Sequence, residues 1–137
     1  MTPEIFVNKY NLHDSIIDSV ATESNGTVIR MVVDFAFWMQ EGYKEEHAET
    51  GPLAVCFSGV TEFDCPNQLP LEEISILKAS LQDSSIIFAL LNDMTDEYYE
   101  IRIKARDITV VDQTGQEWNL LISDRCDMIY LSPPICR

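Results

Sequence analysis

Apolar and polar side chains alternate along residues 27–38, TVIRMVVDFAFW. The even positions of this stretch include Arg30 and Asp34. The odd positions are large and apolar: Ile29, Met31, Val33, Phe35 and Phe37. A two-residue period is typical of a strand that packs one face on a core and exposes the other face to water. We therefore predict that residues 27–38 form the central strand of an antiparallel sheet.

Further strands follow from the same period or from short apolar runs between turn residues. Asn25–Gly26 and Gln113–Gly115 are the expected hairpin connections, because Asn and Gly tolerate the backbone conformations of tight turns. Gly59 is expected to mark a β-bulge, since the apolar parity changes after it. The predicted strands are residues 16–21, 53–58, 86–91 and 99–105, and a last strand that carries Trp118, Leu120 and Ile122. The strand of residues 99–105 is expected to continue through Ile108 and Val110 after a change of parity.

Two segments fit a helix. For residues 3–10 we favour a short helix over an edge strand, with Thr2 as N-cap and Pro3 at the first helical position. Residues 71–81 are ambiguous, because their leucines have a helical spacing while Ile74 and Ile76 alternate as in a strand. The strands expected on both sides favour a strand from about Ile74 to Leu81.

Seven or eight short strands without βαβ alternation predict a mainly β chain, with α+β as the alternative. We expect one domain, residues 1–137, in which an antiparallel sheet forms a sandwich or partly open barrel with one or two short helices. With 46% hydrophobic residues the chain can build a core.

The sequence shows no apolar run near the roughly 20 residues that a membrane helix needs. The first ten residues, MTPEIFVNKY, have neither a basic leader nor a long apolar segment, so the cytoplasm is the expected location. None of the four cysteines belongs to a CxxC pair, and in that compartment we expect four free thiols. A bridge from Cys136 to Cys65 or to Cys126 is the alternative.

His13-Asp14-Ser15 contains the residue types of a hydrolytic triad. Adjacent strand residues point to opposite faces, however, so these three cannot converge, and no G-x-S-x-G motif is present. We expect a structural role, in which Asp14 or Ser15 accepts backbone N–H groups and His13 bonds across a turn.

His47 lies among Glu45, Glu46 and Glu49, which could in principle bind a divalent cation, but we expect a solvated loop there. No catalytic, cofactor-binding or metal-binding residue is predicted, and no cofactor. The chain is therefore expected not to be an enzyme.

Charge is the strongest feature of the composition. Twenty-three acidic residues against nine basic ones give a net charge of −14, which repels nucleic acid and anionic membranes and attracts basic proteins. Solubility alone is the alternative explanation of this charge. Arg102, Lys104 and Arg106 share one strand and are expected to pair with acids across the sheet rather than to bind nucleic acid.

The acidic residues gather, beside tyrosines, in two connecting segments, where binding residues are usually displayed. Acidic surroundings with tyrosine anchors suit the capture of a basic protein. The candidate partner-binding residues are Glu41, Tyr43, Glu45, Glu46, Glu49, Asp93, Asp96 and Glu97.

The run Tyr10-Asn11-Leu12-His13-Asp14-Ser15, the apolar hairpin after it and the pattern Leu53-x-x-x-Phe57-x-Gly59-Val60 suggest a family. Together they resemble small acidic immunity-type proteins of bacterial polymorphic or contact-dependent toxin systems. The likeness covers about the first half of the chain. It implies a cytoplasmic, largely β antidote that covers the active site of a cognate toxin and has no catalysis of its own.

A nuclease with a basic cleft as that toxin would account for the charge. Two alternatives stay open. One is a small-ligand-binding β-barrel or an uncharacterised enzyme with its site in the mouth of the sheet, and the other is an acidic mimic of nucleic acid.

Overall fold

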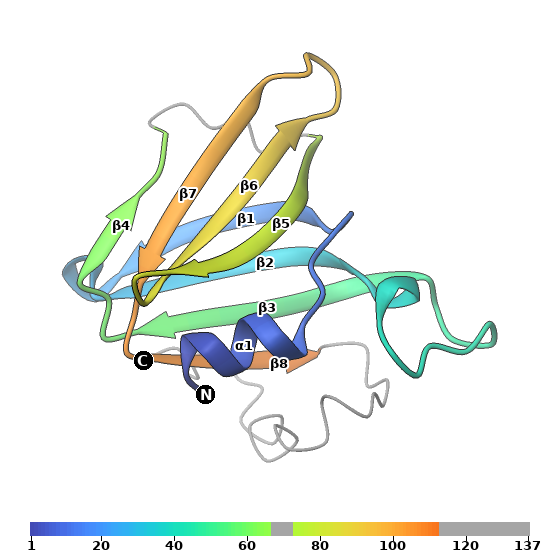
Figure 1. Cartoon of the computed structure of the whole chain (residues 1–137), viewed down its shortest axis with the longest axis horizontal. Helices are drawn as coiled ribbons and strands as arrows, with labels where there is room; N and C mark the ends of the chain where they lie inside the picture. The colour runs from blue at the N-terminus through green and yellow to red at the C-terminus, as the bar shows by residue number, and fades with distance from the viewer. Residues whose placement is uncertain (67–72, 113–137) are drawn as a thin grey trace.

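The computed structural model describes residues 1–66 and 73–112 (Figure 1). Its eight strands form one antiparallel sheet in the order β4-β7-β6-β5-β1-β2-β3-β8. The prediction of a mainly β chain with seven or eight antiparallel strands is confirmed. The elements are α1 (Pro3–Lys9), β1 (Ile16–Glu23), the 3-10 turn η1 (Ser24–Gly26), β2 (Val28–Ala36), the 3-10 turn η2 (Phe37–Met39), β3 (Thr50–Ser58), β4 (Glu62–Asp64), β5 (Ile74–Gln82), β6 (Ser85–Asn92), β7 (Tyr98–Lys104) and β8 (Asp107–Asp112).

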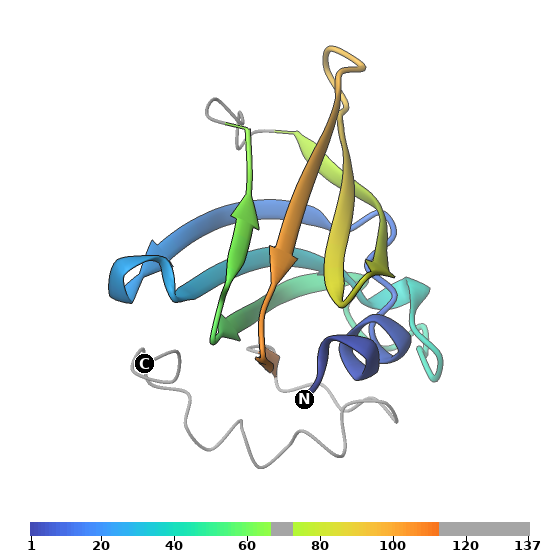
Figure 2. The ribbon, with the colours of Figure 1, turned by 60° about the vertical axis from the view of Figure 1, so that its left-hand side comes forward.

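The sheet is curled because two long strands bend at the same place. β3 runs on into β4 and β7 into β8, and the β3–β8 ladder ends at Ser58↔Asp107 where the β4–β7 ladder begins at Glu62↔Lys104. Residues 59–61 therefore lie opposite residues 105–106. That one extra residue makes the corner a β-bulge, as predicted from Gly59, whose φ is +64°. Figure 2 shows β4, β7, β6 and β5 rising steeply from the layer of β1, β2 and β3.

The curl is held loosely between β1 and β5. Within these two strands the ladder consists of the single pair Ile16↔Ser75. Two backbone hydrogen bonds extend it, from Asp14 N–H to Ile76 O (2.9 Å) and from Ile76 N–H to Ser15 O (2.7 Å). This splayed side makes the arrangement a partly open barrel.

Aromatic side chains fill the inside of the curl. Phe57 meets Phe6 and Phe88 edge-on, with ring centroids 6.1 and 6.2 Å apart. Helix α1 carries Phe6 and contacts β5, β6 and β8. The aromatic residues among the largest fully buried side chains are Tyr10, Phe6, Phe35, Phe37, Phe57 and Phe88. The described interior is thus packed with side chains.

Several local predictions are confirmed. Thr2 Oγ1 accepts the N–H of Ile5 at 3.3 Å at the start of α1, next to Pro3. The hairpin between β1 and β2 turns at η1, where Asn25 and Gly26 have φ of 57° and 83°. The ambiguous segment forms a strand, β5, with a register shift between residues 76 and 78.

Two boundaries differ from the prediction. Strand β2, which lies between β1 and β3, ends at Ala36 and not at Trp38, because η2 turns the chain there. Residues 107–112 were predicted to continue the strand of residues 99–105. The corner after β7 redirects them instead, and as β8 they pair with β3. The predicted connection 113–115, the strand through residues 118–122 and the C-terminal tail lie outside the described residues.

Candidate functional site

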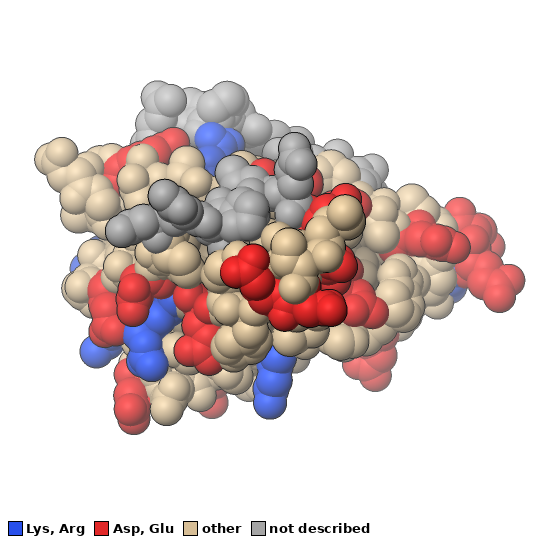
Figure 3. All heavy atoms as spheres, turned by 90° about the horizontal axis from the view of Figure 1, so that it is seen from above, with Lys and Arg blue, Asp and Glu red and all other residues tan. Residues whose placement is uncertain are grey.

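The eight candidate residues fall into two clusters. Residues 41–49 connect η2 to β3 and project at the right-hand end of Figure 1, while residues 93–97 form the turn between β6 and β7 at its top. Seen from above in Figure 3, acidic side chains gather in the middle of the view and again at the projecting end on the right. Basic side chains form fewer, scattered spots in this view.

The first cluster contains a surface pocket of about 540 Å³, lined by Trp38, Tyr43, Glu45 and Glu49. Trp38 is 45% exposed, and its backbone N–H donates to Glu49 O at 3.2 Å. The Tyr43 ring packs partly against the core, and its hydroxyl donates to His47 O at 3.3 Å. The structure thus brings three of the candidate residues together around a tryptophan.

Trp38 is not among the residues predicted for this site. It was expected at the end of the strand formed by residues 27–38, whereas η2 turns the Trp38 side chain toward the acidic loop. A signal was present, because Trp38 is a large aromatic residue on the same parity as Arg30 and Asp34 and stands directly before that loop.

Gln40 holds the base of this loop. Its side chain is buried, and the amide nitrogen donates to Asn11 O at 2.6 Å and to Ala36 O at 2.9 Å. The amide oxygen accepts the N–H of Asn11 at 3.1 Å. These bonds fix the loop to the segment between α1 and β1.

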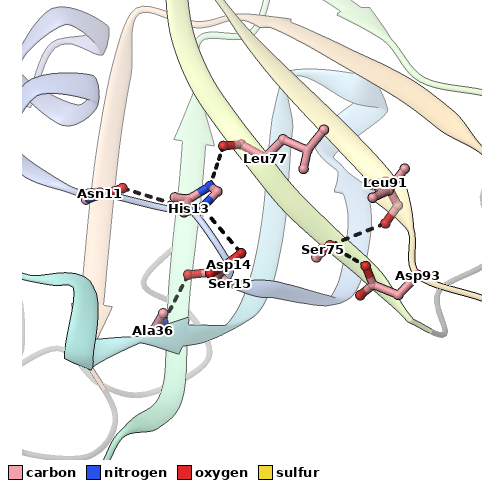
Figure 4. Close-up of polar contacts among 9 residues, drawn as sticks. All are labelled: Asn11, His13, Asp14, Ser15, Ala36, Ser75, Leu77, Leu91 and Asp93. Atoms are coloured by element: carbon pink, nitrogen blue, oxygen red, sulfur yellow. Dashed lines mark hydrogen bonds and ion pairs between the residues drawn. The ribbon is translucent and has the colours of Figure 1, made fainter. Parts of the chain in front are cut away.

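The second cluster is organised by Asn92. Its Oδ1 accepts the backbone N–H groups of Met94 and Thr95 at 2.9 and 3.2 Å, as in an Asx-turn. The turn leaves Met94 77% and Tyr98 56% exposed. Asp93 folds back toward β5, where its Oδ1 accepts the hydroxyl of Ser75 at 3.0 Å (Figure 4).

One row of side chains on the outside of the sheet joins the two clusters. Directly paired residues of antiparallel strands place their side chains on the same face. The pairs link Pro52, Asp34, Ile16, Ser75, Leu91 and Tyr98, which we call the outer row. Five steps between strands span roughly 24 Å along the sheet at about 4.8 Å a step. Pro52 follows the first acidic loop and Tyr98 the second.

Negative charge is crowded beside the outer row. Asp18 lies in the register shift of β1 between Ile17 and Ser19. Desolvation, and next the nearby Asp34 carboxylate, raise the pKa of Asp18. A cation from a partner would relieve this repulsion.

Tyr98 donates its hydroxyl to Glu100 Oε2 at 2.6 Å. This hydrogen bond, followed by desolvation and the charge of Glu100, raises the pKa of Tyr98. Desolvation, and next the charge of Glu97, raise the pKa of Tyr99, whose ring packs against the core. Tyr98 is therefore the exposed phenol of this end, and Tyr99 is the packed one.

Ser15 has the predicted structural role of accepting a backbone N–H group, whereas His13 contacts a distant strand and does not bond across a turn. Buried Ser15 Oγ accepts the N–H of Ala36 at 3.0 Å, and His13 Nδ1 lies 2.8 Å from Leu77 O on β5 (Figure 4). His13 Nε2 is 3.5 Å from Asp14 Oδ1. These contacts join the segment before β1 to β2 and β5.

A larger surface pocket, of about 580 Å³, lies between the segment after α1, η2 and β5. Lys9, His13 and Lys78 are the basic groups of its lining, and Glu41 is an acid there. Neither in this pocket nor elsewhere in residues 1–66 and 73–112 do three or more His, Cys, Asp or Glu side chains form a group that could hold a metal ion.

Arg102 of β7 pairs with an acid across the sheet, as predicted: its Nε lies 3.7 Å from Glu62 Oε1. Lys104 stands opposite Glu62 in the ladder. Arg106 does not share this strand, because β7 ends at Lys104 and Arg106 lies in the corner beside Gly59.

The expectation of four free thiols is wrong for Cys56, which is disulfide-bonded. The spacing of cysteines in the sequence does not reveal which ones the fold brings within bonding distance. Cys65 is a free thiol, and burial, followed by the charge of Asp64, raises its pKa.

In the part of the chain that the structure describes, no helix has the length and apolar character needed to cross a membrane. Comparison with known proteins gives no relative from which a role could be transferred: no protein-family model matches the chain, and no curated protein or solved structure is similar to it.

Proposed function

We propose that this chain is a non-enzymatic binding protein of the immunity type, which neutralises a basic toxin domain by covering its active site. The observation that carries the proposal is the outer row, because it joins the two acidic clusters and presents the partly or largely exposed side chains of Ile16, Leu91 and Tyr98 between them. In such an interface the charge raises the rate of encounter and the apolar contacts set the lifetime of the complex.

The size of this surface fits a protein partner. A standard interface buries about 800 Å² on each side, which corresponds to a patch about 30 Å across. The outer row spans most of that width. Tyr98 stands at one end of the row, and Trp38 lines the pocket of the acidic loop that precedes Pro52 at the other end. Both are large aromatic side chains that are about half exposed, and such residues often dominate binding energy.

Charge complementarity indicates what the partner's surface looks like. A nuclease binds phosphates with Lys and Arg side chains, so its cleft is basic. Carboxylates such as Glu45, Glu49 and Asp93 can occupy the positions of phosphates and exclude the substrate. The resemblance of residues 10–15 and 53–60 to immunity-type proteins supports the same partner class.

The test is co-expression with the product of the adjacent gene, followed by size-exclusion chromatography and an assay of that product's toxicity. We expect a complex whose association rate falls steeply with salt, because exposed charges are screened. Tyr98→Ala is expected to weaken it about tenfold or more. Leu81→Ala is the matched control, since Leu81 is 41% exposed but lies six residues along β5 from Ser75, roughly 20 Å away.

Absence of a complex with that product and with basic nucleases would contradict the proposal. Equal losses for Tyr98→Ala and Leu81→Ala would place the interface elsewhere and contradict the role of the outer row.

We also propose a cytoplasmic location, as an antidote of this type requires. Disulfides are rare in that compartment, so Cys56 provides the check. Because Cys56 is buried in the folded chain, cells are quenched in acid and thiols are then alkylated under denaturing conditions, which should label Cys56 if the chain is cytoplasmic. An oxidised, unlabelled Cys56 would place the chain in an oxidising compartment.

A second candidate function rests on the larger pocket beside His13. Among the described residues of its lining, three basic groups stand against one acid, which favours a small anionic ligand. Thermal unfolding with citrate and with inorganic phosphate tests this, with Lys78→Ala as the variant that should lose the effect. No shift in the unfolding temperature with either anion would rule it out.

A further inference from the structure

We infer that the pocket formed by Trp38, Tyr43, Glu45 and Glu49 binds an arginine side chain of the partner. The inference rests on the proposed function, because it names the group by which a basic protein is held.

The chemistry of the lining selects the occupant. The pocket has two aromatic rings and two carboxylates, and none of its lining residues within 1–66 and 73–112 is basic. A guanidinium is planar, stacks on an aromatic face and donates paired hydrogen bonds to carboxylates. The ammonium of lysine is more strongly hydrated and cannot stack in this way. An arginine can therefore stack on the aromatic rings and hydrogen-bond to the carboxylates at the same time.

The pocket is preformed. Its opposite sides are joined by the backbone hydrogen bond from Trp38 to Glu49, and Tyr43 is oriented by its hydroxyl bond to His47 O. Buried Gln40 fixes the loop to the segment after α1. The volume of about 540 Å³ lies within the range of ligand-binding pockets.

The surrounding loop adds attraction for a cation. Besides the two lining carboxylates, Glu41 and Glu46 lie in the same loop but do not line the pocket, and Lys44 is its one lysine. The loop therefore offers a matched pair of comparisons. Glu45→Gln/Glu49→Gln and Glu41→Gln/Glu46→Gln change the net charge equally, and only the first alters the pocket.

The experiment uses the full chain with Trp118→Phe, which leaves Trp38 as the single tryptophan. Its fluorescence is titrated with an arginine–glycine repeat peptide, a lysine–glycine peptide of equal length and a citrulline–glycine peptide. Citrulline keeps the shape of arginine without its charge.

We expect saturable quenching by the arginine peptide, weaker binding of the lysine peptide by about fivefold, and no binding of the citrulline peptide. Glu45→Gln/Glu49→Gln should weaken binding of the arginine peptide about tenfold, and Glu41→Gln/Glu46→Gln should weaken it less than about twofold. By calorimetry, Trp38→Leu should show a loss similar to that of the first pair, with the fold checked by circular dichroism.

Equal effects of the two glutamate pairs would overturn the inference, because they would show only long-range attraction. Equal affinity for the arginine and lysine peptides would overturn it as well. If a toxin complex forms and Trp38→Leu leaves its affinity unchanged, the pocket inference fails while the proposed function stands. If the peptide binds as expected but no basic protein is captured, the pocket stands and the proposed function fails.

Discussion

The hydroxyl of Ser15 accepts the backbone N–H of Ala36 at 3.0 Å, where both residues are fully buried. Ser15→Ala leaves that N–H without its partner, so we expect a loss of about 1–3 kcal/mol in the free energy of unfolding, measured with urea. Ser19→Ala on the same strand is the control and should change little, since the described structure shows no side-chain hydrogen bond for Ser19. A loss equal to that control would show that the Ser15 bond contributes nothing.

Gly59 faces Arg106 at the corner of the sheet. A Cβ on Gly59 would lie 2.9 Å from Arg106 Cβ, and the residue has a φ of +64°. Gly59→Ala is therefore expected to destabilise the fold by about 1–3 kcal/mol, from strained backbone and a steric clash. Gly26→Ala is the matched control, because its φ is +83° but nothing lies within 4 Å of the added Cβ. The free energies of unfolding of the two variants are measured with urea, and their difference gives the cost of the steric clash. Equal losses of stability in Gly59→Ala and Gly26→Ala would contradict the clash.

Asp18→Asn should stabilise the protein in a pH-dependent way. Because desolvation and Asp34 raise the pKa of Asp18 above its ordinary 3.8, the folded protein holds this proton more tightly than the unfolded chain does. The stability that this proton provides is present below pH 3.8 and is lost as the pH rises through the raised pKa. The gain in the free energy of unfolding from Asp18→Asn should thus be absent in acid and constant at neutral pH. It should stay below about 1 kcal/mol, because water screens this exposed group.

Unfolding free energies across this pH range provide the measurement for Asp18. In an Asp34→Asn background the gain should shrink, since one cause of the raised pKa is removed. A gain independent of pH would show that it does not arise from the carboxylate's charge.

Glu100→Ala should lower the pKa of Tyr98 toward its ordinary value of 10.0, because the variant removes both the hydrogen-bond acceptor and the negative charge. Tyrosinate absorbance and NMR of the ring resonances follow this titration. Tyr99 is the internal control, since desolvation and Glu97 account for its raised pKa. An unchanged pKa for Tyr98 would mean that Glu100 does not hold the phenol neutral.

The sequence predicts the strands well where alternation runs without interruption, as in Val28–Ala36. It is ambiguous at β5 for a physical reason, because the register shift between residues 76 and 78 reverses the parity and imitates a helical stripe. It does not predict which strand β8 pairs with. β8 follows β7 in the chain, and the corner that redirects it onto β3 depends on contacts between residues 59–61 and 105–106, far apart in the sequence.

The candidate site was predictable in part. The acidic loops stand out in composition, and the structure places Tyr43, Glu45 and Glu49 in one pocket. The outer row was not predictable, because its members come from six strands and only their register brings them into line. The disulfide of Cys56 depends on tertiary proximity in the same way.

The amide of Gln40, which spans from Asn11 to Ala36, has a consequence for the thermodynamics of association. A surface loop that is ordered only on contact loses conformational entropy at that moment, which weakens binding. Here the base of the loop is already fixed by folding, so less ordering remains for the moment of contact. Association should then show little change in backbone dynamics, and the affinity should reflect mainly the groups that touch.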